Sequence, residues 1–265
     1  MRKTDLFRAT IRPQAGFSNR IDGIISLWRF QDLLRARGIN MEFSINWPIG
    51  GVTTGDYGDV ILNPMKLRAV DDVTEGMLGW SLWIAKEEAP LDFKVISKDH
   101  QCCVLKRSYE DMPQTVIDTL LPYFNRVKWH PYVVEKSEAI KLEPGTIGVH
   151  CREADDWDKA GRSLGGVDPY FRMIDSLPVS PIYLVCHHKR FTDAFIARYG
   201  NRRITVQPDK DYESHTPRQL QHAIVDMLTL AKMPLLVGDA DSSFLHNAWW
   251  FGGCKAKVIR LHFKR

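Results

Sequence analysis

The sequence lacks the features that would place the protein in a membrane or hold it together covalently. Its 265 residues include no apolar run long enough to cross a bilayer, and the basic residues 1–8 are not followed by the apolar segment of a secretion signal. The five cysteines are odd in number and have no CxxC spacing, so neither a disulfide framework nor a zinc site is favoured. We therefore expect a cytoplasmic protein with reduced thiols and no transmembrane segment.

The sequence also lacks a strong excess of charge of either sign. Lysine and arginine number 36 against 32 acidic residues, which gives a net charge of +4. A mildly basic surface suits a ligand that carries phosphate, but it is far from the concentrated basic face of a nucleic-acid-binding protein. With 44% hydrophobic and 26% charged residues, the chain has the composition of a globular protein with one large or two smaller domains.

Strand and helix patterns alternate along most of the chain. In the N-terminal part we expect a strand at 6–11, a helix at 21–37 and a strand at 40–45. The segment 47–132 mixes Gly and Pro with short apolar runs and is harder to interpret, apart from a helix expected at 112–124. In the C-terminal part the predicted strands are 147–151, 182–186, 203–206 and 235–237, and the predicted helices are 169–176, 191–199, 219–231 and 244–250. This alternation predicts an α/β fold with parallel sheets flanked by helices.

Three polar loops that each follow a predicted strand are the candidates for a binding site. The first contains Gly16, Asn19 and Arg20 before the first helix. Gly16 can bring backbone close to a ligand, and the following helix N-terminus offers N–H groups to an anion. The same residues also suit an ordinary turn and helix cap.

The second candidate lies at the end of the strand 147–151, with His150 in the strand and Arg152 directly after it. At the two-residue period of a strand, both side chains point to the same side where the strand ends, which is the place where open α/β sheets bind ligands. A hydrogen-bonding ring and a permanent positive charge would then meet an anion together. The alternative is a buried core histidine beside a surface ion pair.

The third loop runs from Asp239 to Phe244, between a strand and a helix. Ser242 and Ser243 lie at the expected helix N-terminus, where hydroxyl and N–H groups can bind phosphate oxygens. Helix capping by Asp241 or Ser242 is compatible with that role. Asp239 and Asp241 also form a DxD pair, which in some transferases holds a divalent cation, although such pairs often occur by chance.

These segments, taken in order, resemble the fucosyltransferase superfamily that includes the rhizobial nodulation fucosyltransferase, the core α-1,6-fucosyltransferase and the protein O-fucosyltransferases. The segments that carry the resemblance are GFSNR, IGVHCR, PIYLVCHHKRF and AIVDMLTLAKMPLLVGDADSSF. The resemblance is strongest over 147–253 and weak over 47–132. It implies a GT-B-like fold of two Rossmann-type domains, which we place at 1–135, on the acceptor side, and at 136–265, on the nucleotide-sugar side.

The resemblance also implies a reaction and the residues that perform it. Such enzymes transfer fucose with inversion from GDP-fucose, which is a donor substrate and not a cofactor, to a glycan or glycoconjugate, without a bound metal. Arg152 would hold the β-phosphate and stabilise the leaving GDP, and His150 and Asp226 would contact the guanine or nucleoside. The remaining donor-binding residues implied by the resemblance are Gly16, Asn19, Arg20, Ser242, Ser243 and Phe244.

Inversion requires either a base near the acceptor hydroxyl or an acceptor that reacts without one. Asp155 and Asp156, just beyond Arg152, are the candidates, together with Asp158, and each also suits a solvated loop or an ion pair. Peripheral membrane contact is compatible with a glycolipid acceptor. A non-catalytic protein that binds sugar or nucleotide, with some of the eight tryptophans stacking on sugar rings, is the alternative from another class.

Overall fold

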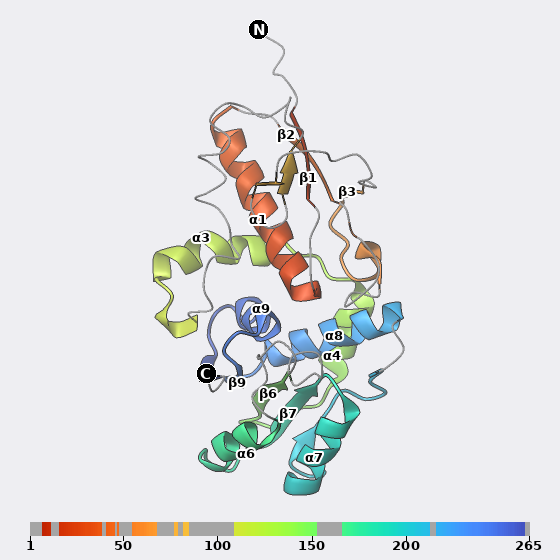
Figure 1. The fold of residues 1–265 in the computed structure, drawn as a ribbon, viewed down its shortest axis with the longest axis vertical. Helices are drawn as coiled ribbons and strands as arrows, with labels where there is room; N and C mark the ends of the chain where they lie inside the picture. Colours follow the sequence, from red (N-terminus) through yellow and green to blue (C-terminus); the bar gives the residue numbers. More distant parts are fainter. Residues whose placement is uncertain are drawn as a thin grey trace. The chain divides into compact units, whose positions relative to one another are not determined.

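The computed structural model describes residues 7–11, 16–38, 41–45, 47, 55–67, 77–78, 82–84, 109–152, 166–212 and 216–262. The chain divides into two compact units, one formed by 1–106 and 115–129 and the other by 107–114 and 130–265. Each unit has a five-stranded sheet. Figure 1 labels β1, β2 and β3 of one sheet and β6, β7 and β9 of the other. No helix in the described part of the chain is both long enough and apolar enough to cross a bilayer.

The sheet of the first unit is parallel on one side and antiparallel on the other. Its strand order is β3-β2-β1-β5-β4. Strands β1 (Phe7–Ile11), β2 (Met41–Ile45) and β3 (Lys66–Leu67) are parallel, whereas β5 (Leu82–Ile84) runs antiparallel to both β1 and β4 (Met77–Leu78). The antiparallel edge falls in the segment whose sequence gives no clear pattern.

Helix α1 (Phe17–Ala36) begins directly after Gly16, four residues earlier than the apolar pattern predicts. Its buried side chains include Ile24 and Leu34, which have no exposed surface. Trp47 is also part of this core: its ring contacts those of Phe17 and Tyr57 at centroid distances of 6.2 and 5.6 Å. This environment favours a packing role for Trp47 over sugar stacking.

Three shorter helical segments are also among the described residues. They are η1 (Tyr57–Asp59), α3 (Gln114–Phe124) and, in the second unit, η4 (Tyr109–Asp111). The last of these contacts the edge strand of the second sheet through Asp111, whose carboxylate accepts a hydrogen bond from Arg260 at 2.9 Å.

The sheet of the second unit is parallel throughout and has the strand order β10-β9-β6-β7-β8. The strands are β6 (Ile147–Cys151), β7 (Ile182–Cys186), β8 (Ile204–Thr205), β9 (Leu235–Asp239) and β10 (Lys257–Leu261). The chain adds strands in one direction from β6 to β8 and then returns to add β9 on the other side of β6. The order therefore reverses between β6 and β9, which makes that junction a topological switch point.

Helices cover both faces of this sheet (Figure 1). The helices are α4 (Pro131–Ala139), α6 (Asp168–Asp175), α7 (Lys189–Tyr199), α8 (Pro217–Leu230) and α9 (Ser243–Phe251). Tyr170 and Phe195, from α6 and α7, pack with Val149 on one face. Gly148 faces Leu230 of α8 on the other, as the alternation of a strand requires.

The architecture confirms the predicted α/β class, and several strands match their predicted bounds. β6 and β7 coincide with the expected segments because their side chains are buried on both faces, which produces continuous apolar runs. Helix α4 was not predicted. Its signal is His130-Pro131, since Pro131 suits the first helical position and the His130 side chain accepts a hydrogen bond from the Tyr132 N–H.

Replacing Gly238 tests the contact between β6 and β9. A Cβ there would lie 2.9 Å from the backbone oxygen of His150 and 3.0 Å from Leu245 Cδ2, so the backbone must shift. We expect Gly238→Ala to lower the free energy of unfolding by about 1–3 kcal/mol in urea titrations. Gly58→Ala, at an exposed position where a Cβ meets nothing among the described residues, is the control; equal stability of both variants would contradict the close approach.

Candidate functional site

Two of the three polar loops meet at the switch point of the second sheet. His150, the fourth residue of β6, pairs with Gly238 of β9, so the carboxyl ends of both strands lie side by side. Ligands of open α/β sheets bind in the crevice outside the carboxyl ends of the strands at such a reversal of strand order. The topology alone therefore makes this edge the candidate ligand site.

His150 connects the two loops directly. Its Nδ1 lies 3.1 Å from Ser242 Oγ, although the two residues are 92 positions apart in sequence. The imidazole also stacks on the ring of Phe244, with a centroid distance of 4.8 Å and an interplanar angle of 21°. His150 thus contacts two other residues of the predicted donor-binding set.

The buried position of His150 determines its charge. Burial, followed by the positive charges of Arg152 and Lys210 and the proximity of His187, lowers the pKa of His150 well below 6.5. The ring is therefore neutral near pH 7 and carries one N–H donor and one acceptor nitrogen. A neutral imidazole fits both the stacking on Phe244 and the hydrogen bond with Ser242.

Ser242 is the N-cap of α9. Its Oγ accepts the Leu245 N–H at 3.2 Å, which confirms the predicted capping role, and its hydroxyl hydrogen can be donated to His150 Nδ1. With that donation the imidazole proton lies on Nε2. The next two residues, Ser243 and Phe244, open the helix, and N–H groups in the first turn of a helix have no acceptor four residues earlier within it. Together with the helix dipole, they suit an anion.

Arg152 lies one residue beyond the end of β6. Its backbone N–H donates to the Tyr170 hydroxyl at 3.3 Å, and its half-buried side chain lies close enough to His150 for its charge to lower that pKa. A guanidinium is thus held at the carboxyl edge of the sheet. The following residues 153–165, which include the predicted catalytic Asp155 and Asp156, lie outside the described residues.

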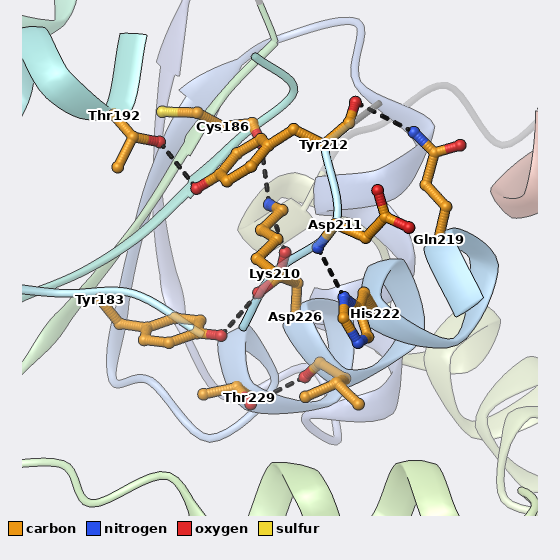
Figure 2. Close-up of polar contacts among 11 residues, drawn as sticks. Tyr183, Cys186, Thr192, Lys210, Asp211, Tyr212, Gln219, His222, Asp226 and Thr229 are labelled. Atoms are coloured by element: carbon orange, nitrogen blue, oxygen red, sulfur yellow. Dashed lines mark hydrogen bonds and ion pairs between the residues drawn. The ribbon is translucent and has the colours of Figure 1, made fainter. Parts of the chain in front are cut away.

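Asp226 lies on α8 and is 1% exposed. Its two oxygens accept hydrogen bonds from the Tyr183 hydroxyl at 2.7 Å and from Lys210 Nζ at 2.6 Å (Figure 2). The guanine contact implied by the family resemblance stays a prediction. Lys210 was not singled out in the sequence, because a lone lysine in a polar connection is indistinguishable from a surface residue until the fold places it.

The DxD pair has a structural role in the turn after β9. Asp239 is buried, and its Oδ1 accepts the backbone N–H of Asp241 at 2.6 Å, a local contact that stabilises the turn. Among the residues that the structure describes, no three His, Cys, Asp or Glu side chains are grouped as metal ligands.

The residues of the first polar loop lie in the first unit. Gly16 is the N-cap residue of α1 and has extended backbone angles, φ −67° and ψ 165°, which match the turn-and-cap interpretation. Arg20 is buried with its guanidinium carbon 4.9 Å from the centre of the Trp47 ring, and burial lowers the pKa of Arg20 to about 10. Asn19 is half-buried. Donor binding by these three residues stays a prediction.

The neutral state of His150 predicts a pH dependence of stability. Below pH 6.5 the unfolded chain binds a proton at His150, whereas the folded chain keeps the ring neutral. This difference does not change the free energy of unfolding above pH 6.5, but it lowers that free energy increasingly as the pH falls. One such histidine changes the free energy of unfolding by at most about 1.4 kcal/mol per pH unit. We expect urea unfolding between pH 7.5 and 5.5 to show a shallower slope for His150→Gln than for the native protein.

A matched control uses an exposed histidine. His262→Gln should leave the slope as it is, because that side chain lies in solvent. His222, whose pKa is lowered by burial and by Arg218, keeps its own part of the slope in both variants. A native slope that persists unchanged in His150→Gln would contradict the buried neutral ring.

The fold is similar to those of solved fucosyltransferases. No protein-family model matches the sequence, and the search of curated proteins also finds no match. The structure of NodZ α-1,6-fucosyltransferase soaked with GDP-fucose superposes with a TM-score of 0.59 at 14% identity, covering 97% of this chain and 95% of that one. Fucosyltransferase NodZ from Bradyrhizobium gives 0.54 at 15% identity, with 92% of both chains covered.

A second kind of fucosyltransferase is also similar. POFUT1 in complex with GDP gives a TM-score of 0.51 at 10% identity, and 98% of each chain is covered. The match extends over nearly the full length in every case, so it includes both units. The protein therefore has the GT-B-like α/β fold of these fucosyltransferases.

Proposed function

We propose that the protein is an inverting glycosyltransferase that transfers fucose from GDP-fucose to a glycan or glycoconjugate hydroxyl. The observation that carries the proposal is the contact of His150 with Ser242 and Phe244 at the switch point, beside Arg152. These groups provide an aromatic and imidazole surface, a helix N-terminus and a guanidinium at one edge of a sheet. A nucleoside diphosphate needs all three kinds of contact.

The similarity to solved structures supports the choice of nucleotide. The NodZ crystal was soaked with GDP-fucose, and the POFUT1 structure is a complex with GDP. Because the identities are only 10 to 14%, the fold is shared but individual ligand contacts do not carry over. The donor assignment for this chain consequently depends on the chemistry of its own switch-point residues.

Arg152 is the residue that we propose stabilises the transition state. As the bond between the sugar and GDP breaks, negative charge builds up on the β-phosphate, and a fixed cation that binds this charge more strongly than the ground state lowers the barrier. The first-turn N–H groups at Ser243 and Phe244 would act in the same direction. The negative charge on the leaving GDP is then balanced by groups of the protein, without a divalent metal.

The acceptor side of the reaction is proposed from the sequence. Asp155 or Asp156 would accept the proton of the acceptor hydroxyl as it attacks the sugar, because both follow Arg152 closely in the chain. The N-terminal domain would bind the acceptor, with Gly16, Asn19 and Arg20 approaching the donor.

The first prediction of this proposal concerns nucleotide selectivity. Calorimetric titration of the native protein with GDP, UDP, ADP and CMP in the presence of EDTA should show binding of GDP at least about tenfold tighter than of the others, since lost base-edge hydrogen bonds leave polar groups unpaired. A response only to UDP with manganese would instead support a metal-dependent transferase that uses another nucleotide sugar.

The second prediction concerns Arg152. Arg152→Ala should weaken GDP binding by about 10- to 100-fold, because a charge-assisted contact to phosphate is lost. The rate of GDP release from GDP-fucose with a glycan acceptor should fall by about 10²- to 10³-fold, by analogy with the loss of one oxyanion donor. Arg152→Lys should lie between, since lysine keeps the charge but not the planar fork.

Arg198→Ala is the matched control for this experiment. Arg198 pairs with Asp175 at the C-terminal end of α7, on the edge of the sheet opposite to the site. It should leave GDP affinity and turnover at native values. If native protein and Arg152→Ala bind GDP equally but neither releases it from GDP-fucose, the protein is a binding protein and not a transferase.

A further inference from the structure

His187 directly follows β7, just as Arg152 directly follows β6. The two strands are adjacent and parallel, and their last residues, Cys186 and Cys151, are partners in the ladder. Paired strands lie about 4.8 Å apart, so Arg152 and His187 are attached to neighbouring strand ends at the same level. Both lie at the carboxyl edge of the sheet, where open α/β sheets bind their ligands.

The imidazole of His187 also lies near His150. The charged groups of described residues that lower the pKa of His150 are Arg152, Lys210 and His187. Because the interaction between charges weakens with distance, a side chain with this effect must be close to the switch point. The strand register thus places His187 with Arg152, and the electrostatic effect places it with His150.

The backbone at His187 is fixed by a contact with the next connection of the sheet. Lys210 Nζ donates to the carbonyl oxygen of Cys186 at 2.8 Å, and this carbonyl belongs to the peptide group that joins Cys186 to His187 (Figure 2). The His187 ring meets that of His188 edge to face, with a centroid distance of 4.6 Å, and the His188 ring lies 6.1 Å from that of Phe191. The His187 side chain is nevertheless exposed, so a ligand at this edge can reach it.

The charged and titratable groups on the elements around His187 determine how readily its ring is protonated. Two lysines are paired, Lys210 with Asp226 at 2.6 Å and Lys189 with Asp193 at 2.7 Å. Cations near a histidine disfavour its charged form, whereas a diphosphate bound beside it would favour that form. The groups on these elements are His150 and Arg152 at β6, Asp168 on α6, His188, Lys189, Arg190 and Asp193 at the start of α7, Lys210, Asp211 and Tyr212 in the β8–α8 connection, and Arg218, His222 and Asp226 on α8.

We propose that His187 is a second contact for the donor diphosphate, beside Arg152, and that its imidazole takes up a proton from the solvent when the donor binds. This inference rests on the proposed function, because it requires that the ligand at this edge carries a diphosphate. Histidine is the side chain whose charge a modest change of surroundings can alter near neutral pH. The anion would therefore be held by one permanent cation and by a second that forms in its presence.

Coupling to a proton gives donor binding a definite pH dependence. The complex holds the proton on His187 more tightly than the ligand-free protein does. Donor affinity is therefore highest below the pH range in which the ring titrates, and it falls as the pH rises through that range. If His187 is instead only an exposed residue that precedes α7, its protonation does not affect the affinity. The pH dependence therefore distinguishes a ligand contact from a surface position.

Calorimetric titration with GDP-fucose tests the proton uptake. Both phosphates of this donor are substituted on two oxygens and keep one negative charge each, whereas the terminal phosphate of GDP itself titrates near pH 6. Heats of binding measured near neutral pH in two buffers with different ionisation enthalpies give the number of protons taken up. We expect roughly half a proton for the native protein, and an affinity that falls about tenfold from about pH 6 to about pH 8.

Two variants separate the charge of His187 from its place in the fold. His187→Gln cannot be protonated, so it should take up no proton and should bind at every pH with the weaker affinity that the native protein has at high pH. His187→Lys stays positively charged, so it should also take up no proton, but near pH 8 it should bind within about threefold of the native affinity near pH 6. Because the side chain is exposed, both variants should keep the native Tm.

His262→Gln is the matched control, because it removes an exposed histidine that follows β10, three strands away from β7 in the sheet order. It should keep the native proton uptake and affinity. The inference would be overturned by a native protein that takes up no proton, by uptake that persists in His187→Gln, or by a His187→Lys variant that binds no better than His187→Gln near pH 8. Failure of the native protein to bind GDP-fucose at any pH would instead overturn the proposed function, and this inference with it.

Discussion

The parallel pairing of β6 with β9 is the constraint on which the site depends. These strands are far apart in sequence, yet they must be adjacent for the order of the sheet to reverse between them. Gly238 permits this approach, because a side chain there would collide with the backbone of His150. Once the ladder forms, the carboxyl end of β6 and the N-terminus of α9 lie at the same edge of the sheet. The contact between His150 and Ser242 follows from that geometry.

Burial at the edge of the sheet decides the charge state of the polar groups. His150 is neutral because burial and nearby positive charges oppose its protonation. Asp226 and Lys210 are buried together as an ion pair, since each charge would be costly to bury alone. The same low-polarity surroundings thus give a neutral ring in one place and a compensated ion pair in another. Both outcomes leave little uncompensated charge beneath the candidate site.

The sequence was sufficient for the parts of the fold that are set by local patterns. β6 and β7 were predicted with their exact bounds because they are largely apolar runs, and the helix cap was narrowed to Asp241 or Ser242, of which the structure has Ser242. The contact of Lys210 with Asp226 was not accessible, because it joins residues 16 positions apart through a polar connection of no regular pattern. The antiparallel edge of the first sheet was missed for the same reason, since two short strands carry too few residues for a period.

The two cations near the candidate site differ in what they can contribute to catalysis. Lys210 has all its donors bound to protein groups, so its contacts do not strengthen as charge develops on a ligand. Only interactions that are stronger in the transition state than in the ground state accelerate a reaction. Arg152 is half-buried at the end of β6 and its charge is permanent, and we propose that it binds the β-phosphate. Rate enhancement is therefore expected from Arg152, whereas Lys210 serves the shape of the site.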